Sequence, residues 1–454
     1  MFFISVVLLL AGSINAAPIE SWGYNTYGQL GNGTKANGYT PERIVQIWNA
    51  VSVSAGGEHS LALLSDSTLM GWGYNADGQL GNGTTVDSDT PIVVYGIKNA
   101  VAISAKGEHS LALLSDGTIK SWGNNEYGQL GDGTTIDRDT PVTVLGINNA
   151  VKISAGWEYG TALLSDGRIK AWGYNNSGQL GNGTKIDSDT PIVVYGINNA
   201  IEISAGVLHG LALLSDSTIR AWGLNKYGQL GNGTTVDSDT PVIVSGINNA
   251  KGVSAGTSHN LAVLSDGAVK AWGYNGCGQL GNGTFIDTDT PVVIPGISNA
   301  VIVSAGSMFS LALLSNSTVQ AWGRGDLGQI GNGEDNSVKV PVQIGVIAWG
   351  ISAGDFHSLA LEAPPAVEEQ ITNRQIVSIG SSIFVNKITL LLPVEQKIQY
   401  AIYDVCGRVL LTRGESLIKG KLDINVSKIK QGVYFLVVKT AGKRSCFKVI
   451  KLIK

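Results

Sequence analysis

Cysteine is scarce in this chain, which limits covalent cross-linking to a single pair at most. Only three Cys occur in 454 residues. Cys406 and Cys446 both lie near the C-terminus, so they are the candidate pair for a disulfide in an exported protein, and two unpaired thiols are the alternative. Cys277 stands alone in a variable position of a repetitive region.

Long hydrophobic runs are absent beyond the N-terminus, so no transmembrane segment is predicted. Residues 1–17 form a short apolar run that ends in small residues, which is typical of a signal peptide cleaved near Ala16 or Ala17. No Lys or Arg precedes this run. A buried first strand or a misplaced start codon is the alternative interpretation.

Charged residues are also few, at 15% of the chain, and they are unevenly distributed. Residues 371–454 contain 15 Lys/Arg and 4 Asp/Glu, a net charge of +11. The remainder then holds 16 Lys/Arg and 31 Asp/Glu, a net charge of −15, and the two parts sum to −4. An acidic main body is unfavourable for nucleic-acid binding, so no nucleic-acid partner is expected.

Glycine, by contrast, is abundant, with 60 residues, and it recurs in a 50-residue repeat. The motif W-G-x-N-x-x-G-Q-L-G-N-G-T begins at Trp22 and returns every 50 residues, with a degenerate copy at Trp322. A second motif, S-A-G or S-A-K, begins at Ser54 and returns six more times, the last time at Ser352. Each series has seven members, which indicates a repeat architecture.

Each repeat has the pattern of four short strands, and no helical period is present. In residues 151–198, two apolar runs flank Asp166-Gly167, which is a strong hairpin signal, and a long Gly/Asn/Asp loop leads to another β-branched run. This pattern predicts one blade of a β-propeller. The chain enters at a third strand and leaves after a second, so we expect a seventh blade assembled from residues 19–47 and 347–361.

The unit S-A-G-x-x-H-S-L-A-L-L-S-D-G-x-x-x-A-W-G-x-N-x-x-G-Q-L-G-N-G-T resembles the repeat of the regulator of chromosome condensation family over residues 20–361. The resemblance implies a seven-bladed β-propeller over residues 18–361. It does not imply one function, because such propellers serve several.

The tail is predicted to be a separate small β domain over residues 376–454, after a Pro/Glu-rich linker at 362–375. The stretches YDVCGRVL, INVSKIKQGVYFLVVKT and FKVIKLIK resemble the C-terminal sorting domain of the bacterial type IX secretion system, although the family's Pro-Asn-Pro opening is absent. The resemblance implies an immunoglobulin-like β-sandwich, contact with the secretion machinery, and localisation outside the cell or at its outer surface. An ordinary immunoglobulin-like accessory domain is the alternative.

Most invariant residues of the repeat have structural explanations. The repeated Trp are expected to pack between blades, and the Gly of G-Q-L-G-N-G to adopt positive φ. All five His occupy one repeat position, where Tyr159 and Phe309 replace them, so this is a packing position and not a metal or catalytic site. The repeated Asp-x-Asp pairs, such as Asp87 and Asp89, are expected to cap loops, with calcium binding as the alternative.

Two dipeptides in each repeat vary freely, and strand parity places both on one face of the propeller. They are the x-x of S-A-G-x-x and the x-x of N-x-x-G-Q-L-G, whereas the loops predicted on the opposite face barely change. Aromatic residues mixed with charges are typical of binding surfaces, and relaxed packing at loop tips is the alternative. The candidate binding residues are Tyr27, Glu58, Asp77, Glu108, Tyr127, Trp157, Glu158, Tyr159, Leu208, Tyr227, Met308, Phe309, Asp326 and Phe356.

The sequence therefore predicts an exported binding propeller that recognises a protein or a surface glycan, with no catalytic residue, cofactor or metal ion. One alternative is a polysaccharide-active enzyme, since Glu58, Glu108 and Glu158 recur on successive blades. Another is a small-GTPase exchange factor or chromatin-binding protein, which the family resemblance suggests.

Overall fold

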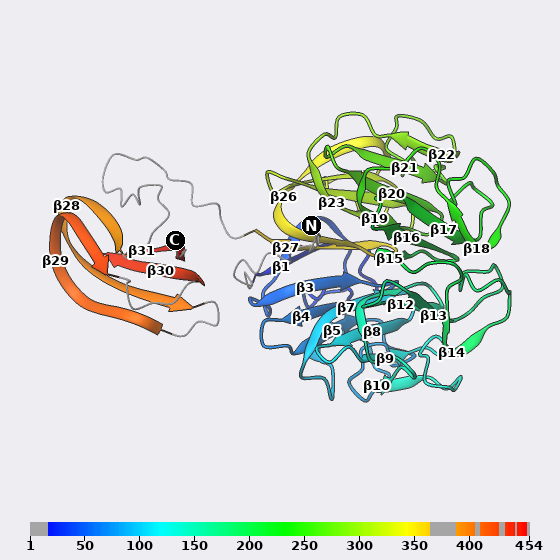
Figure 1. Ribbon diagram of the computed structural model, residues 1–454, viewed down its shortest axis with the longest axis horizontal. Coiled ribbons are helices and arrows are strands. Elements are labelled where there is room, and N and C mark those ends of the chain that lie inside the picture. The colour runs from blue at the N-terminus through cyan, green and yellow to red at the C-terminus, as the bar shows by residue number, and fades with distance from the viewer. Residues whose placement is uncertain (1–16, 364–386, 405–408, 426–431, 441–442, 452–454) are drawn as a thin grey trace. The chain divides into compact units, whose positions relative to one another are not determined.

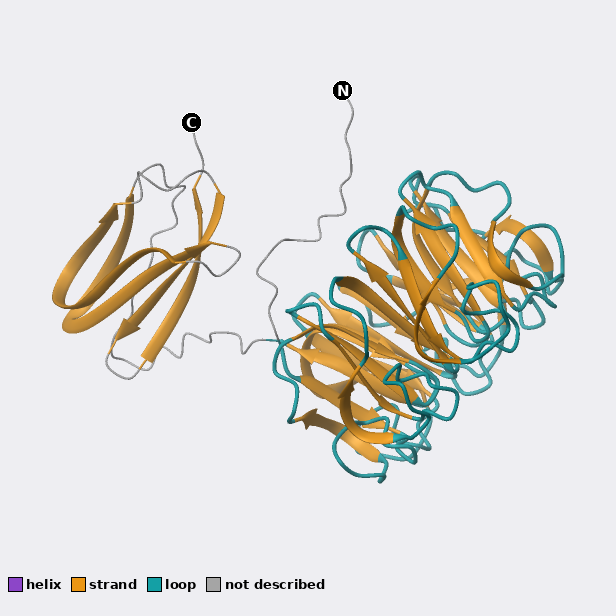
Figure 2. Ribbon diagram, turned by 90° about the horizontal axis from the view of Figure 1, so that it is seen from below, coloured by secondary structure: helices purple, strands orange, loops and turns teal. Residues whose placement is uncertain are grey.

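The computed structural model describes residues 17–363, 387–404, 409–425, 432–440 and 443–451, and these consist of strands and loops (Figure 2). They fall into two units, one of which is Ile14–Pro364. The other contains residues 365–454. Within the described ranges, no helix is long and apolar enough to cross a bilayer. The predicted signal peptide, apart from Ala17, lies outside the described residues.

The first unit contains seven blades of four antiparallel strands, as expected from the repeat. Blades 1 to 5 are separate sheets in which the strands follow chain order. Blade 1 contains β3 (Ala50–Ala55), β4 (His59–Leu64), β5 (Leu69–Gly73) and β6 (Ser88–Val93), and blade 2 contains β7 (Ala100–Lys106), β8 (His109–Leu114), β9 (Ile119–Gly123) and β10 (Arg138–Thr143). Blade 3 contains β11 (Ala150–Ala155), β12 (Tyr159–Leu164), β13 (Ile169–Gly173) and β14 (Ser188–Val193), and blade 4 contains β15 (Ala200–Ala205), β16 (His209–Leu214), β17 (Ile219–Gly223) and β18 (Ser238–Ile243). Blade 5 contains β19 (Ala250–Ala255), β20 (His259–Leu264), β21 (Val269–Gly273) and β22 (Thr288–Val293).

The last two blades share a strand, and the pairing of N-terminal and C-terminal strands in blade 7 closes the ring (Figure 1). Blade 6 contains β23 (Ala300–Ala305), β24 (Phe309–Leu314), β25 (Thr318–Gly323) and the first part of β26 (Val338–Ala353). The second part of β26 is the inner strand of blade 7, followed by β27 (His357–Glu362), β1 (Ile19–Gly23) and β2 (Gly38–Ile44). Strands β1 and β27 pair antiparallel, with Ser21 opposite Leu359. The prediction that both ends of the repeat region build one blade is confirmed.

The seven repeated Trp hold neighbouring blades together. Each is almost completely buried, and its indole Nε1–H donates to the backbone oxygen of the Gln in the preceding blade at 2.8–3.1 Å. Trp72, for example, donates to Gln29, and Trp22 donates to Gln329 across the closure. The buried N–H therefore keeps a partner in every blade, which removes the cost of desolvating it.

Glycine is required where this indole packs. Gly31 has φ +66°, and a Cβ on it would lie 2.7 Å from Trp72 Nε1. The equivalent Gly of the other blades also have positive φ and face the next Trp, as the sequence predicts.

A second ring of contacts surrounds the central axis. The Ser of each S-A-G motif accepts the amide N–H of the corresponding Ala in the next blade at 2.9–3.0 Å. Ser352 of blade 7 accepts from Ala55 of blade 1, so the ring of contacts is complete.

The second unit contains one four-stranded antiparallel sheet with the order β29-β28-β30-β31. Its strands are β28 (Lys387–Asp404), β29 (Val409–Asn425), β30 (Gly432–Thr440) and β31 (Lys443–Lys451). An all-β second unit is confirmed, and its immunoglobulin-like sandwich arrangement stays a prediction. Cys446 lies opposite Val437 in this sheet, but Cys406 lies outside the described residues, so the predicted disulfide stays a prediction.

Replacing Leu359 in the closing strand with Ala should destabilise the propeller strongly. Leu359 is 0% exposed, so Leu359→Ala should lower the free energy of unfolding by about 2–5 kcal/mol. Val45→Ala is the control, because Val45 is 62% exposed, and it should change the free energy by about 0.5 kcal/mol or less. Denaturant unfolding of both variants measures this, and equal effects would contradict a buried closing strand.

Candidate functional site

The two variable dipeptides of each repeat lie on the same face of the propeller, as predicted. In blade 1, the backbone N–H of Tyr74, which begins the loop after the third strand, donates to the oxygen of Glu58 in the loop between the first two strands. The equivalent bond occurs in all seven blades at 2.8–3.0 Å. We call this surface the diversified face, and it comprises the two variable dipeptides of every blade.

Side chains of neighbouring blades meet on the diversified face. Cys277 Sγ of blade 5 lies 3.8 Å from Met308 Sδ of blade 6. The guanidinium carbon of Arg324 in blade 6 lies 5.9 Å from the ring centroid of Phe356 in blade 7. The face is therefore a continuous surface and not seven separate loop tips.

The opposite face carries the nearly invariant turns. In blade 1, Ser65 N–H donates to Asn49 O, which joins the turn after β4 to the loop before β3, and the same bond joins Ser115 to Asn99. Asp66 and Asp116 cap these turns by accepting from Thr68 and Thr118 at 3.0 Å. The invariance of this face is explained by these local caps.

Most of the predicted binding residues lie on the diversified face with accessible side chains. Glu108 and Asp326 are exposed. The half-buried residues are Tyr27, Glu58, Asp77, Tyr127, Trp157, Glu158, Leu208, Tyr227, Met308 and Phe356.

Tyr159 and Phe309 were wrongly assigned to the exposed surface. Both are 0% exposed, because they begin a second strand and occupy the buried position that His takes in the other blades. The hydroxyl of Tyr159 donates to the backbone oxygen of His209 in blade 4 at 2.5 Å. Both residues therefore belong to the packing between blades.

The histidines are confirmed as packing residues with an optional hydrogen bond. His59 Nε2 lies 2.9 Å from Ser110 Oγ of the next blade, and His357 Nε2 lies 2.7 Å from Ser60 Oγ. Burial lowers the pKa of both rings to about 3, so they are neutral at physiological pH.

Sequence reasoning missed a third variable position, the x of W-G-x-N. It holds Tyr24, Tyr74, Tyr174 and Tyr274 in four blades, all half-buried on the diversified face. Three of these Tyr pack against the Tyr of an x-x-G-Q-L-G dipeptide in the preceding blade. The pairs are Tyr27–Tyr74, Tyr127–Tyr174 and Tyr227–Tyr274, with ring centroids 4.7–4.8 Å apart. The variation at this position is visible in the sequence, because Asn124, Leu224 and Arg324 replace Tyr in the other blades.

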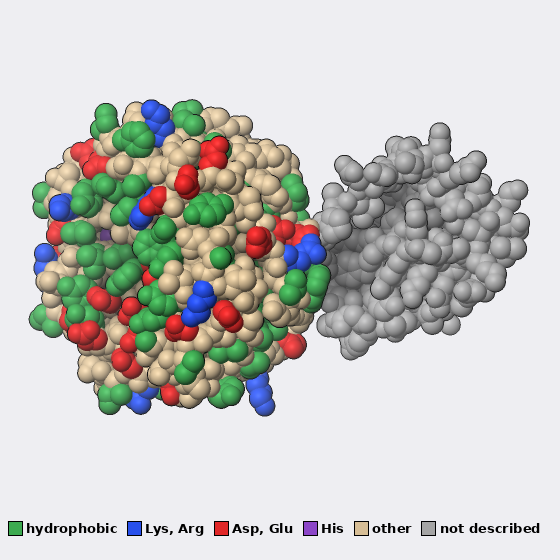
Figure 3. Space-filling view, turned by 180° about the vertical axis from the view of Figure 1, so that it is seen from behind, with side chains coloured by type: hydrophobic (Ala, Val, Ile, Leu, Met, Phe, Trp, Pro, Cys, Tyr) green, Lys and Arg blue, Asp and Glu red, His purple; other side chains and the backbone are tan. Residues whose placement is uncertain are grey.

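Acidic side chains gather on blades 1 to 3 of the diversified face. We call Glu58, Asp77, Glu108, Glu126 and Glu158 the acidic arc. Glu108 is exposed, yet partial desolvation, followed by the nearby Asp77, Glu58 and Glu158, raises its pKa to about 7. Burial first, and then nearby carboxylates, also raises the pKa of Asp77 and of Glu158. Figure 3 shows acidic and hydrophobic side chains interspersed on one side of the propeller.

Two oppositely charged side chains, half-buried Lys106 and buried Asp355, lie near the centre of the ring without a hydrogen bond between them. Lys106 replaces the Gly of S-A-G in blade 2, and its Nζ donates across the axis to Ala205 O at 3.2 Å and Ala255 O at 2.9 Å. Burial lowers the pKa of Lys106 to about 8, and burial raises that of Asp355 to about 6, which Lys106 partly offsets. Lys106 therefore links blade 2 to blades 4 and 5.

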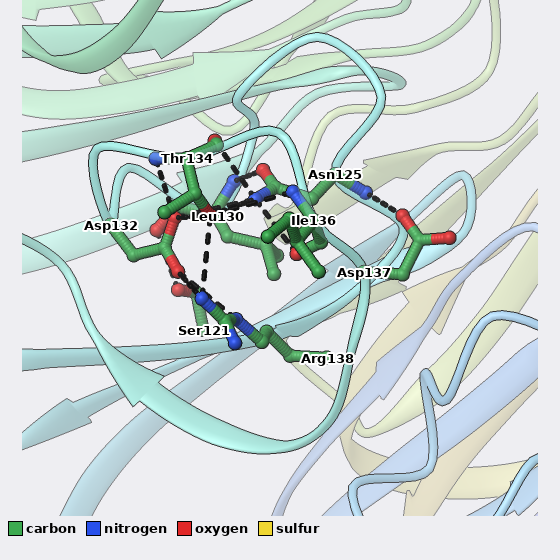
Figure 4. Close-up of polar contacts among 8 residues, drawn as sticks. All are labelled: Ser121, Asn125, Leu130, Asp132, Thr134, Ile136, Asp137 and Arg138. Atoms are coloured by element: carbon green, nitrogen blue, oxygen red, sulfur yellow. Dashed lines mark hydrogen bonds and ion pairs between the residues drawn. The ribbon is translucent and has the colours of Figure 1, made fainter.

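The Asp-x-Asp loops use their first carboxylate as a cap, as expected (Figure 4). In blade 2, Asp137 Oδ1 accepts the backbone N–H of Asn125 at 2.7 Å. The side-chain N–H groups of Asn125 donate to Thr134 O and Ile136 O, and its Oδ1 accepts the backbone N–H of Leu130. The same pattern holds in blade 1 around Asn75. Within the described ranges, no group of three or more His, Cys, Asp or Glu could hold a metal ion.

Comparison with known proteins identifies both units. The model of the RCC1-like domain matches residues 19–360, and that of the secretion system C-terminal sorting domain matches residues 384–453. No curated protein matches this chain.

Two solved structures share the propeller fold. Human WBSCR16 has a TM-score of 0.70 and 21% identity, covering 76% of this chain and 99% of its own. Prp20p from Saccharomyces cerevisiae has a TM-score of 0.70 and 24% identity, covering 78% and 93%.

Removing the Glu108 carboxylate should stabilise the protein at alkaline pH. The pKa of Glu108 is about 7 in the folded protein, whereas the ordinary pKa of Glu is near 4.5. Between these two pH values the folded state binds more protons than the unfolded state. The free energy of unfolding therefore falls as pH rises from about 4.5 to about 7. Glu108→Gln should therefore have the higher Tm at pH values above this range and a similar Tm below it.

Glu334→Gln in blade 6 is the control, because it also removes one exposed carboxylate but lies outside the acidic arc. A Tm difference between Glu108→Gln and the parent protein that is the same at every pH would contradict the raised pKa of Glu108.

Proposed function

Because the chain belongs to the RCC1-like propeller family and ends in a secretion system sorting domain, we propose that it is an exported bacterial module that binds a protein or glycan through the diversified face. The sorting domain points to secretion or to the cell surface. Contact with the secretion machinery follows from that domain.

The observation that carries this proposal is the contrast between the two faces. The turns of the opposite face repeat the same caps from blade to blade. The diversified face is held by the same backbone bonds in every blade, yet its side chains include Trp157, Leu208, Met308 and Phe356 beside several carboxylates. The opposite face also exposes large side chains, such as Tyr95 and Tyr195. The change of residue type from blade to blade, and not apolar content alone, therefore supports binding by the diversified face.

Binding without catalysis fits the arrangement of the carboxylates. Glu58, Glu108 and Glu158 occupy the same position in successive blades and lie among other carboxylates, not in separate acid and base environments. A glycosidase needs two carboxyl groups with distinct roles. A screen for sugar release tests the polysaccharide-active alternative.

The likeness to Prp20p supports a common fold alone. Prp20p has binding properties toward Gsp1p and histones, but its identity to this chain is 24%. The present chain carries a sorting domain, so we propose an extracytoplasmic partner instead.

Trp157→Ala should weaken capture of any partner retained by the immobilised full chain. A central aromatic of a binding surface contributes about 2 kcal/mol or more to affinity. Tyr195→Ala is the matched control, because Tyr195 is a large aromatic, 67% exposed, in the loop between β14 and β15 on the opposite face. Retention from cell-surface extracts, with Tm as the folding check, measures this. Equal losses in both variants, or loss with the control alone, would contradict the proposed face.

A further inference from the structure

The acidic arc coincides with two of the three tyrosine pairs. Tyr27 of blade 7 packs on Tyr74 of blade 1, with ring centroids 4.8 Å apart, and Tyr127 of blade 2 packs on Tyr174 of blade 3 at 4.7 Å. The carboxylate of Glu58 lies close enough to Tyr27 to be the main cause that raises the pKa of that phenol. Asp77 and Glu108 act on Tyr74 in the same way, after burial. Glu126 and Glu158 raise the pKa of Tyr127 in the second pair. Each pair therefore combines aromatic ring surface with adjacent carboxylates.

The third tyrosine pair holds a cation. In this pair, Tyr227–Tyr274, the ammonium group of Lys226 lies 5.3 Å from the ring centroid of Tyr227. At other repeat positions, Arg324 of blade 6 lies over Phe356 of blade 7 and is also paired with Asp326. Among residues 17–363, no Lys or Arg lies over Tyr27, Tyr74, Tyr127 or Tyr174. The third pair thus shows that such a ring face can accept a cation, and on the acidic arc the propeller residues supply none.

A buried carboxylate beside the arc also has no partner. Asp355 is 2% exposed, and its Oδ2 has no hydrogen-bond partner among the described residues. It lies next to the backbone of Gly57, since a Cβ on Gly57 would be 3.3 Å from this oxygen, and Glu58 follows directly in the chain. The nearby cation, Lys106, directs its Nζ hydrogen bonds to two backbone oxygens on the far side of the axis. This part of the face therefore carries more negative charge than the side chains of residues 17–363 neutralise.

We propose that the acidic arc and its two tyrosine pairs bind a Lys- and Arg-rich segment of a protein partner. This inference rests on the proposed function and specifies its ligand. A guanidinium group can stack on a tyrosine ring while its edge donates two hydrogen bonds to a carboxylate, which is the combination of groups that each pair presents. A neutral glycan could stack on the same rings, but it would leave the mutual repulsion of the carboxylates in place, so the observations favour a cationic segment.

A labelled peptide of alternating Arg and Gly tests this with the full chain. Fluorescence anisotropy should show binding that weakens as salt rises, and a Glu/Gly peptide of equal length should not bind. The triple variant Glu58→Gln, Glu108→Gln and Glu158→Gln should weaken binding by about tenfold to a hundredfold.

The matched control removes three carboxylates from the opposite face. Asp66→Asn, Asp116→Asn and Asp166→Asn change the net charge by the same amount, and Asn keeps a side-chain oxygen for the turn cap. Its affinity for the Arg/Gly peptide should be close to that of the parent protein. An equal loss in both triple variants would overturn the proposal, because binding would then depend on net charge and not on the arc.

A second variant separates the aromatic contribution from charge. Tyr74→Leu with Tyr174→Leu keeps every carboxylate and should still weaken the Arg/Gly peptide, whereas the same peptide with Lys in place of Arg should lose less, because an ammonium group cannot stack as a plane. No effect of these substitutions on either peptide would overturn the stacking arrangement.

The outcomes distinguish this inference from the proposed function. If the protein does not bind the Arg/Gly peptide but binds neutral oligosaccharides, and Trp157→Ala weakens that binding, the cationic ligand is refuted and the diversified face is supported as the binding surface. A protein whose partner capture is insensitive to substitutions on this face refutes both.

Discussion

The indole N–H of the repeated Trp, bonded to a buried backbone oxygen of the preceding blade, is the constraint on which the rest of the propeller depends. It occurs seven times, including across the closure from Trp22 to Gln329, so no blade is held only by its own sheet. It also explains the second Gly of G-Q-L-G-N-G, since the turn that presents the Gln oxygen lies against the indole ring at that residue. The invariant residues of a blade are therefore mainly those that contact the neighbouring blades, as is general for repeat proteins.

This arrangement leaves the two variable dipeptides and the x of W-G-x-N in each blade free to change. The backbone around them is held by bonds between main-chain groups, such as that from Tyr74 to Glu58, which no side-chain substitution removes. Side chains at these positions can then be selected for what they contact outside the molecule. The result is a surface on which blades 1 to 3 carry most of the carboxylates beside tyrosine. Blades 4 to 7 carry Leu208, Met308 and Phe356 with the cations Lys226 and Arg324, besides the third tyrosine pair.

The sequence predicted the blades, the closure and the common face, because each depends on a pattern that is repeated seven times. It failed at Tyr159 and Phe309, since variation at a buried position looks the same in one sequence as variation at a surface. It also missed Tyr24 and Tyr74, which vary less than the dipeptides around them. The reach of Lys106 to Ala205 and Ala255 could not be predicted, because it joins blades that are distant in the chain and occurs only once.

The central claim is that the frame and the variable positions are independent, and exchanging positions between blades tests it most directly. The dipeptide Asn176-Ser177 of blade 3 would be exchanged with Lys226-Tyr227 of blade 4, and the unfolding free energy compared with that of Trp172→Phe. The account predicts a change of about 1 kcal/mol or less for the exchange, which separates the Tyr227–Tyr274 pair. It predicts a larger loss of about 2–3 kcal/mol for Trp172→Phe, which leaves the Gln129 oxygen without its indole donor. An exchange as destabilising as the Trp substitution would contradict it.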